Sequence, residues 1–549
     1  MLLSRVSFRE ILMFLRVIAG FGVVVALLAS ARPVGAPVPR TPIQHLVVIY
    51  GENISFDHYF GVYPTALNPE GEPAFHALPN TPEINGLRGA LLTDNPNARN
   101  TENGTGATNP FRLDRTQAST SDQSHSYVAE QRAYHDGAMD LFPRYTGRAG
   151  TGGTGAFGTA GLVMGYFDGN TVTGMWNYAQ HFAMSDNSYG DQYGPSTPGA
   201  IDLIAGQTNG LVLVTGRAGS YLVADGQGGS TMIGDPDPAD DLCSGTSTVR
   251  MTGNNIGDLL NKAGVTWGWF EGGFDLTVTN ADGTTGCGRK THSDVLNRDI
   301  TDYVPHHEPF QYYASTANPR HLRPSSVAAI GTSNDGGANH QYDIKDFYAA
   351  ARAGHLPAVS YLKASAFEDA HAGNSDPIDE QRFVAEVINF LQQTPEWAHT
   401  AVILAYDDSD GWYDHQMAPI GNASFDSLRD QISAPGRCGV RGVTAQLGGV
   451  GGASSVNGRC GPGTRQPFLV VSPWARVNHV DHTQIIQSSI SHFIEDNWLG
   501  GKRMGDGSFD AGAGSILGLF DFDGKGHAPR LFLDPASGVA ISMPAAAKH

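Results

Sequence analysis

The sequence has little positive charge. It carries 35 Lys and Arg residues against 54 Asp and Glu residues, and the formal net charge of the 549-residue chain is −19. The basic residues form no run that would follow a phosphate backbone, so we expect no nucleic-acid partner. With 40% hydrophobic residues the chain can still bury a sizeable core. This composition excludes a disordered or collagen-like protein.

Long hydrophobic runs are also scarce. One stands near the N-terminus, where three arginines precede VIAGFGVVVALLAS at residues 17–30 and small residues follow it. This order predicts a secretory signal peptide over residues 1–31. An uncleaved anchor helix is the alternative, although the run is shorter than the roughly 20 residues that a membrane span needs. We therefore expect an exported protein, periplasmic or extracellular, with no stable membrane span in its mature form.

Only four cysteines occur, Cys243, Cys287, Cys438 and Cys460. They lack the CxxC and Cys/His spacings of zinc sites, and an even number in an exported chain predicts disulfides. Three pairings are open. We favour 243–287 with 438–460, because each of these pairs brackets a glycine-rich segment.

The chain shows no internal repeat and no long linker. Short, β-branched apolar runs predict buried parallel strands at residues 43–50, 400–406 and 467–473, and helical periodicity marks residues 378–393 and 483–498. This alternation predicts an α/β fold whose sheet is covered on both faces. The Gly-, Pro- and Asn-rich segments 64–124 and 147–161 are interpreted as surface excursions.

A pair of residues with side-chain oxygens follows each of two predicted strands, and we call these the acidic pairs although Asn53 is neutral. Glu52 and Asn53 come after the run 43–50, and Asp407 and Asp408 come after the run 400–406. Ligands of open α/β sheets bind beyond the carboxyl ends of strands, so we expect the two pairs to meet in space. Their oxygens favour one divalent ion, Ca²⁺ or Mg²⁺/Mn²⁺, with Zn²⁺ as an alternative if histidines join them. The competing interpretation is that these residues only form turns or cap a helix.

A hydroxyl group stands where a helix is expected to begin. The sequence GPSTPG at residues 194–199 precedes AIDLIAGQT, which indicates a helix with proline at its first position. Ser196 would lie beside the free N–H groups of that helix, where phosphate is held and an alkoxide is favoured. The alternative is that Thr197 is simply the N-cap. Ser196 lacks the GxSxG pattern of α/β-hydrolases, which argues against acyl transfer.

Histidines in polar segments complete the candidate set. They are suited to protonating a leaving group or holding phosphoryl oxygens, although a single histidine among 20 is more often structural. A metal ion, a helix-end hydroxyl and imidazoles are the parts that in-line phosphoryl transfer needs. The histidines are His125, His306, His307, His371 and His415.

Four ordered segments are longer and more specific than these motifs. They are IQHLVVIYGENISFDHYFG at 43–61, MGYFDGNTVTGMWNYAQHFAMSDNSYGDQYGPSTPGA at 164–200, ASAFEDAHAGNSDPIDEQ at 364–381 and AYDDSDGWYDH at 405–415. Together they resemble the bacterial phosphoesterases that include phosphocholine-preferring phospholipases C and acid phosphatases of the A type. The resemblance extends from about residue 42 to residue 500.

The resemblance implies an alkaline-phosphatase-like fold, a three-layer α/β/α sandwich with long inserted loops. It implies one phosphoesterase catalytic domain with surface insertions over residues 42–535, followed by a tail at 536–549. Ser196 would be the nucleophile. His125 and His371 would be the leading proton donors, and the phosphoryl group would be held by Asn53 together with the histidines at 125, 306, 307 and 371. The implied metal ligands are Glu52, Asn53, Asp407 and Asp408.

The resemblance also bears on the substrate. Phospholipases C of the family typically have Asp-Glu-His-Gly or a close variant after the strand and threonine in GPT, whereas this chain has Asp-Asp-Ser-Asp at 407–410 and serine at 196. The sequence thus predicts an exported, metal-dependent acid phosphatase that hydrolyses phosphate monoesters through a phosphoserine intermediate. The alternatives are a phospholipase C of the same superfamily and a secreted binding protein without activity. The sequence leaves the oligomeric state open.

Overall fold

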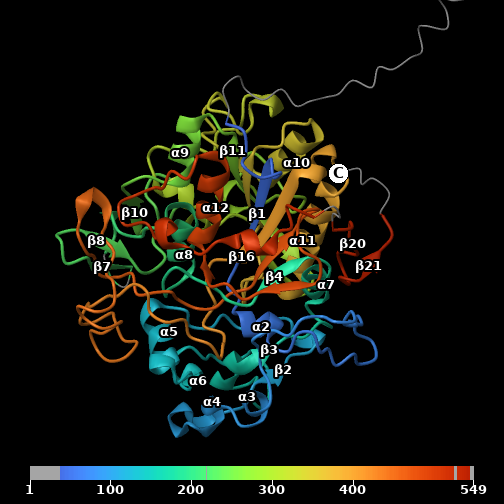
Figure 1. Cartoon of the computed structure of the whole chain (residues 1–549), viewed down its shortest axis with the longest axis vertical. Coiled ribbons are helices and arrows are strands. Elements are labelled where there is room, and N and C mark those ends of the chain that lie inside the picture. Colours follow the sequence, from blue (N-terminus) through green and yellow to red (C-terminus); the bar gives the residue numbers. More distant parts are fainter. Residues whose placement is uncertain (1–36, 218, 220, 525–527, 544–549) are drawn as a thin grey trace, which may run out of the picture. The chain divides into compact units, whose positions relative to one another are not determined.

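An eight-stranded sheet forms the centre of the computed structural model, which describes residues 37–217, 219, 221–524 and 528–543 (Figure 1). The predicted signal peptide lies outside the described residues. Across the sheet the strands follow the order β14 (Gln341–Asp343), β11 (Trp267–Glu271), β15 (Val359–Lys363), β1 (His45–Gly51), β16 (Thr400–Tyr406), β17 (Phe468–Val471), β4 (Ala183–Ser185) and β18 (His479–Asp481).

Seven of these strands run in one direction and β17 runs against them. The predicted parallel strand over residues 467–473 is therefore wrong in direction. Residues 407–467 form no α-helix that crosses the sheet. The chain stays at the edge where β16 ends and re-enters the sheet the opposite way, because a parallel return would need a crossover. As a result, the residues that precede β17 lie at the same edge as those that follow β1 and β16.

Helices cover both faces of the sheet, as the sequence predicts. Figure 1 shows α8 (Ser196–Ala205), α9 (Ile256–Ala263) and α12 (Ser488–Trp498) on one side, and α7 (Thr173–His181), α10 (Ile344–Arg352) and α11 (Pro377–Leu391) on the other. The helix predicted at 378–393 is confirmed to within two residues. The helix predicted at 483–498 begins only at Ser488, because Ile485–Ile486 instead pairs as β19 with β5 (Ser188–Tyr189).

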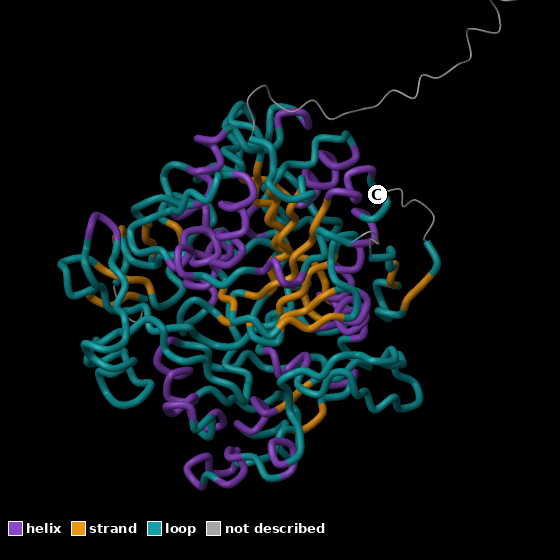
Figure 2. The backbone as a smooth tube through the Cα atoms, viewed as in Figure 1, coloured by secondary structure: helices purple, strands orange, loops and turns teal. Residues whose placement is uncertain are grey.

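Long irregular connections surround this layered centre (Figure 2). They carry the short helices α2 (Phe56–Phe60), α3 (Ala90–Thr93), α4 (Pro96–Arg99), α5 (Tyr127–Tyr134) and α6 (Phe142–Tyr145). Their strands pair outside the central sheet: β2 (Phe111–Arg112) with β3 (Gly165–Tyr166), β6 (Leu211–Thr215) with β10 (Thr248–Met251) and β9 (Asp237–Pro238), β7 (Leu222–Ala224) with β8 (Ser230–Met232), β12 (Lys290–Ser293) with β13 (Arg298–Thr301), and β20 (Phe532–Leu533) with β21 (Ala540–Ile541).

Two disulfides tie these connections together. Cys243 pairs with Cys287 and Cys438 with Cys460, so the favoured pairing is confirmed. Every residue of β16 and of α8 is buried, which places both elements in the core. Among the described residues, every helix is too short or too polar to cross a bilayer.

Candidate active site

The two acidic pairs meet at the carboxyl edge of the sheet. β1 and β16 are neighbouring parallel strands whose last residues, Gly51 and Tyr406, are in register. Asn53 turns the chain after β1 with a left-handed backbone (φ 56°), a conformation that asparagine tolerates better than most residues. Its backbone N–H donates to Asp407 Oδ1 at 3.1 Å. The convergence expected from strand order is therefore present in the structure.

Ser196 reaches this point from the first turn of α8. The helix begins at Ser196 itself, with Pro195 as its N-cap. The expectation that Thr197 caps a helix starting at Pro198 is therefore wrong, and the Thr197 N–H instead donates to Asp235 Oδ1 at 2.9 Å. The first turn packs against the end of β16 because residue 199 is glycine. A Cβ there would lie 2.1 Å from the carbonyl oxygen of Asp407.

Acceptors outnumber donors around the serine hydroxyl. Ser196 Oγ lies 3.0 Å from Glu52 Oε2, 3.0 Å from Asp408 Oδ2 and 3.2 Å from the side-chain oxygen position of Asn53. One hydroxyl proton serves only one of these acceptors. Asp407 Oδ2 is buried and accepts no hydrogen bond. Buried acceptors in such excess, all of them oxygens, fit a hard divalent cation held by residues 52, 53, 407 and 408.

The Asn53 amide fits the site in two orientations. With its nitrogen toward the carboxylates, it donates to Glu52 Oε2 at 2.6 Å, and its oxygen accepts from His371 Nε2 at 3.1 Å. With its oxygen toward the carboxylates, it faces only acceptors. The first orientation satisfies hydrogen bonding without a metal, and the second is the one that a cation ligand requires.

The crowding of these carboxylates shows in their acid–base behaviour. Burial raises the pKa of Asp407 well above its usual range, and the charge of Glu52 raises it further. Burial likewise raises the pKa of Asp408 to about 6. Burial alone would raise the pKa of Glu52 as well, but His307 and Lys363 outweigh it and lower that pKa well below the usual range. Additional positive charge at this point would stabilise the ionised site.

Lys363 and Asp369 belong to the site and are missing from the sequence prediction. Lys363 ends β15, beside β1, and its buried ammonium contacts Glu52 Oε1 and lies 3.7 Å from Asp407 Oδ2. Asp369 follows on the same connection, and its backbone carbonyl accepts from the Glu52 N–H at 2.8 Å. The sequence signal for Lys363 is the short segment that it ends. If that segment is taken as a strand parallel to the first, Lys363 lies at the same sheet edge as Glu52 and Asp407.

Two of the predicted histidines contact residues of the candidate metal site, Glu52 and Asn53. His307 Nε2 lies 3.4 Å from Glu52 Oε1, and His371 Nε2 approaches the side chain of Asn53. Burial lowers the pKa of His307 well below its ordinary value. For His371, burial also acts to lower the pKa, but Asp410, Glu52 and Asp369 outweigh it and raise the pKa.

The other two predicted histidines lie at the margin of the group. His125 Nδ1 is 2.9 Å from Asp410 Oδ1, and the His125 and His371 rings lie 6.0 Å apart between centroids. His306 Nδ1 is 3.5 Å from Asp237 Oδ1. Burial lowers the pKa of His125, but Asp408 and Asp410 outweigh it and raise the pKa well above 6.5. For His306, burial also acts to lower the pKa, but Asp237 and Asp235 outweigh it and raise the pKa. Three of the four imidazoles thus favour the charged form, which suits them to phosphoryl oxygens.

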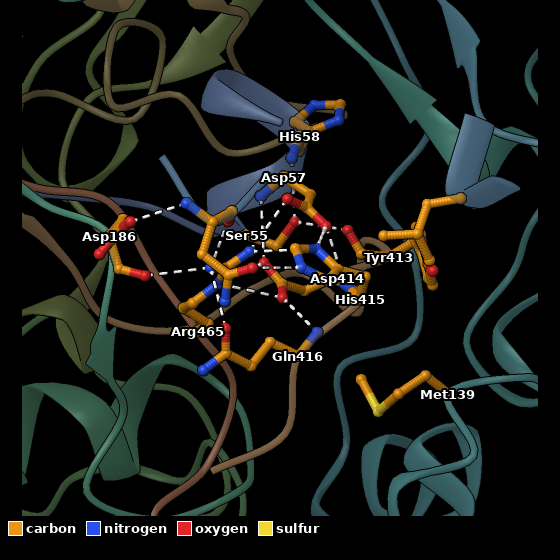
Figure 3. Close-up of polar contacts among 12 residues, drawn as sticks. Ser55, Asp57, His58, Met139, Asp186, Tyr413, Asp414, His415, Gln416 and Arg465 are labelled. Carbon is orange, nitrogen blue, oxygen red and sulfur yellow. Dashed lines mark hydrogen bonds and ion pairs between the residues drawn. The ribbon is translucent and has the colours of Figure 1, made fainter. Parts of the chain in front are cut away.

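The fifth histidine belongs to a different cluster, which we call the Arg465 cluster: Asp57, Asp414, His415 and Arg465. Arg465 Nη2 donates to Asp57 Oδ1 at 3.0 Å, and its Nε donates to Asp414 Oδ2 at 3.0 Å. His415 Nδ1 is 2.6 Å from Asp57 Oδ2. Figure 3 shows the guanidinium between the two carboxylates with the imidazole beside them. His415 is therefore part of an ion network, away from Ser196.

The Arg465 cluster joins the segments that carry the candidate ligands. Asp57 lies just after Glu52 and Asn53, and Asp414 just after Asp407 and Asp408. Arg465 itself lies before β17, at the edge that the reversed strand brings to the site. A buried guanidinium that bridges two carboxylates fixes such segments well, because its donors form a rigid fork.

Sequence comparison relates this chain to known proteins. A profile described as the Phosphoesterase family matches residues 43–499. Phospholipase C A of Mycobacterium tuberculosis is 24% identical over 486 residues, which cover 84% of this chain and 76% of that protein. The non-hemolytic phospholipase C of Pseudomonas aeruginosa is 23% identical over 471 residues, 83% of this chain but only about half (54%) of that protein.

A plant relative matches a shorter stretch. Non-specific phospholipase C1 of Arabidopsis thaliana is 29% identical over 188 residues, 29% of this chain and 31% of that protein. All three relatives are named phospholipases C, so they give no support to the expected place in the acid phosphatase branch. The profile covers most of the chain and includes Ser196 with all four acidic-pair residues, and on this basis the chain belongs to the phosphoesterase family.

Proposed function

We propose that this chain is a metal-dependent phosphodiesterase of the phospholipase C type, with Ser196 as its nucleophile. The observation that carries the proposal is the position of Ser196 Oγ. It lies in the first turn of α8 and within 3.2 Å of three acceptors from Glu52, Asn53 and Asp408. The names of the relatives support a diester as substrate.

The four acidic-pair residues would hold one divalent ion. Mg²⁺, Mn²⁺ or Ca²⁺ suits their oxygens, and Zn²⁺ is the alternative because His307 and His371 are close. A bound divalent ion would lower the pKa of the Ser196 hydroxyl and offset phosphoryl charge. The N–H groups of α8 supply further positive potential at the same place.

The residues of the chain suit two successive displacements. In the first, Ser196 Oγ attacks phosphorus, its proton passes to a neighbouring carboxylate, and the bond to the leaving alcohol breaks. His125 or His371, held as imidazolium, donates the proton that the leaving oxygen takes up. The covalent intermediate is a seryl phosphodiester, because phosphorus keeps its second ester. In the second displacement, water attacks this phosphorus, the same imidazole accepts the proton of the water, and Ser196 leaves with its proton restored while the phosphomonoester is released. Charged imidazoles at the margin would hold the phosphoryl oxygens throughout.

The central sheet with helices on both faces supports the alkaline-phosphatase-like, three-layer α/β/α architecture that the sequence resemblance implies. The two disulfides support export, because such bonds persist in oxidising compartments. The converging carboxylates around Ser196 speak against an inactive binding protein, because unpaired buried charge is costly to keep without a use.

A monoester acid phosphatase is the second candidate. It is favoured by the serine at 196 and by Asp-Asp-Ser-Asp at 407–410, where the phospholipases C of the family typically differ. Both candidates share the nucleophile and the metal ligands. They differ in whether the phosphoryl group carries a second ester.

One assay separates them. Wild type and Ser196→Ala are offered p-nitrophenylphosphorylcholine and p-nitrophenyl phosphate, after chelation and after adding back single metal ions. The proposal expects faster turnover of the diester, loss of turnover on chelation, and loss in Ser196→Ala. Faster turnover of the monoester would favour the acid phosphatase, and full activity of Ser196→Ala would remove Ser196 from the mechanism.

A further inference from the structure

Glu52 divides its two carboxylate oxygens between different surroundings. Oε2 faces Ser196 Oγ at 3.0 Å, inside the group that would hold the divalent ion. Oε1 faces the Lys363 ammonium and His307 Nε2, the latter at 3.4 Å. The carboxylate therefore stands between two polar positions, and only one of them is explained by the proposed metal site.

The second position has the donor atoms of a cation site. Glu52, His307 and Asp369 are all buried, and each offers one atom within 4.8 Å of the others. Two further observations point to a cation there. Asp369 Oδ2 and Asp407 Oδ2 are buried and accept no hydrogen bond, and both residues are at most 2% exposed. Carboxylate and imidazole donors of this kind hold the second ion in two-metal phosphoesterase sites.

An ammonium group already lies at this position. Lys363 Nζ contacts Glu52 Oε1 and lies 3.7 Å from Asp407 Oδ2, which accepts no hydrogen bond. Its side chain is 1% exposed, and the Tyr50 ring covers it at 5.6 Å from Nζ. The backbone of Lys363 is held in β15, which pairs with β1 on one side and with β11 on the other. An ammonium is a compact point charge, so it can replace a metal ion in balancing carboxylates.

We propose that Lys363 fills a second cation position formed by Glu52, His307, Asp369 and Asp407, so that the site works with one divalent ion beside a built-in positive charge. This inference rests on the proposed function, because it presumes a divalent ion at the first position. Lys363 is then a positioning residue. It engages Oε1 of Glu52 and leaves Oε2 for the first ion and the Ser196 side.

Metal stoichiometry tests the inference. Wild type, Lys363→Ala, Lys363→Ala/Asp369→Asn and Lys345→Ala are stripped with chelator and dialysed against Mn²⁺ or Zn²⁺, and bound metal per chain is measured by elemental analysis. We expect one ion in wild type and two in Lys363→Ala, because truncation opens the space and leaves its donors without a cation. The double variant should return to one ion. Lys345→Ala is the control, since the Lys345 ammonium pairs with Asp275, which is not among the proposed metal ligands, and this variant should bind one ion.

The outcomes are separable. A folded Lys363→Ala that still binds one ion would overturn the inference, as would a wild type that binds two. If Lys363→Ala does not fold, Asp369→Asn in the wild-type background decides. The inference predicts one ion, with affinity lowered by no more than about 10–100-fold, which is what loss of an outer-shell partner costs, and loss of that ion would contradict it. A wild type that binds no ion would instead count against the metal in the proposed function.

Discussion

The Ser196 site and the Arg465 cluster are both buried and both rich in charge, but their polar atoms are paired differently. In the Arg465 cluster all four carboxylate oxygens of Asp57 and Asp414 accept hydrogen bonds. In the Ser196 site one serine proton faces three acceptors, and Asp407 Oδ2 accepts no hydrogen bond. Satisfied networks fix a structure, whereas unpaired buried acceptors indicate a missing ligand.

The same contrast separates two histidines that look alike in the sequence. His415 comes at the end of the motif that contains Asp407, but its partner is Asp57 in the satisfied network. His307 comes from a distant segment and lies at the carboxylate group itself, beside Glu52. Nearness in sequence to a ligand is therefore a poor guide to function here, and pairing in space is the better one.

The largest expected effect separates the two clusters by activity. Ser196→Ala should lower the diester kcat by about 10³-fold or more, because it removes the attacking oxygen, and should leave the free energy of unfolding within about 1 kcal/mol of wild type. Steady-state kinetics and urea unfolding measure both. Thr197→Val is the matched control, since the neighbouring hydroxyl is buried without a hydrogen-bond partner. Equal losses in both variants would contradict the assignment.

The opposite result is expected in the Arg465 cluster. Arg465→Met should lower the free energy of unfolding by about 3–5 kcal/mol, because it leaves Asp57 and Asp414 as buried charges without their cation. Urea unfolding of the metal-free protein gives this number without involving the active site. Arg250→Met, which breaks an exposed pair with Asp240, should cost less than about 1 kcal/mol. A similar loss of unfolding free energy in the two variants would show that the Arg465 cluster does not stabilise the fold more than an exposed ion pair does.

Metal binding should stabilise only the unsatisfied site. Saturating divalent ion at about 100 times its Kd should add about 2.7 kcal/mol to the free energy of unfolding of wild type. The gain should be largely absent in Asp407→Asn and fully retained in His415→Gln, because only the first variant alters a proposed ligand. Thermal unfolding with and without the ion checks this. A gain that His415→Gln abolishes would place the metal in the wrong cluster.

The smallest effect is a pH dependence of stability at His415. Burial and the charge of Arg465 act to lower the pKa of His415, whereas Asp57 and Asp414 act to raise it. The carboxylates outweigh the other two effects, so the pKa of His415 is raised. A raised folded-state pKa stabilises the fold below the ordinary value near 6.5, and the contribution fades as pH rises through the raised value. His415→Gln should therefore cost more stability at about pH 6 than at about pH 9.

Urea midpoints of wild type and variant at the two pH values give this difference. His292→Gln is the control, because its partner Asp299 and His292 itself are half exposed, and it should cost less than about 1 kcal/mol at either pH. A cost that stays constant with pH would mean that the imidazolium adds nothing to the network.

The parts of the fold and site that depend on local pattern are predictable from the sequence. The runs before Glu52 and Asp407 are apolar and β-branched, and parallel neighbours bring their ends together, so the sequence predicts that the two pairs converge. The direction of β17 was not predictable in this way, because it depends on whether the connection crosses the sheet. The start of α8 depended on Asp235, which lies far along the chain and takes the Thr197 N–H.

Lys363 shows a different limit. A lysine at the end of an apolar strand is usually interpreted as the point where the strand reaches solvent. The register of β15 with β1 instead places the Lys363 ammonium against Glu52. Strand β15 is only five residues long, which gives little periodicity from which to predict it. Residues that balance charge in a site are harder to predict than those that supply its chemistry.

The stereochemistry at phosphorus tests the central claim most directly. A diester made chiral at phosphorus by oxygen isotopes is hydrolysed in isotopically labelled water, and the configuration of the phosphomonoester product is determined. Two in-line displacements through a covalent seryl phosphodiester at Ser196 predict overall retention of configuration. Inversion would mean that water attacks phosphorus directly, and it would contradict the role of Ser196 as nucleophile.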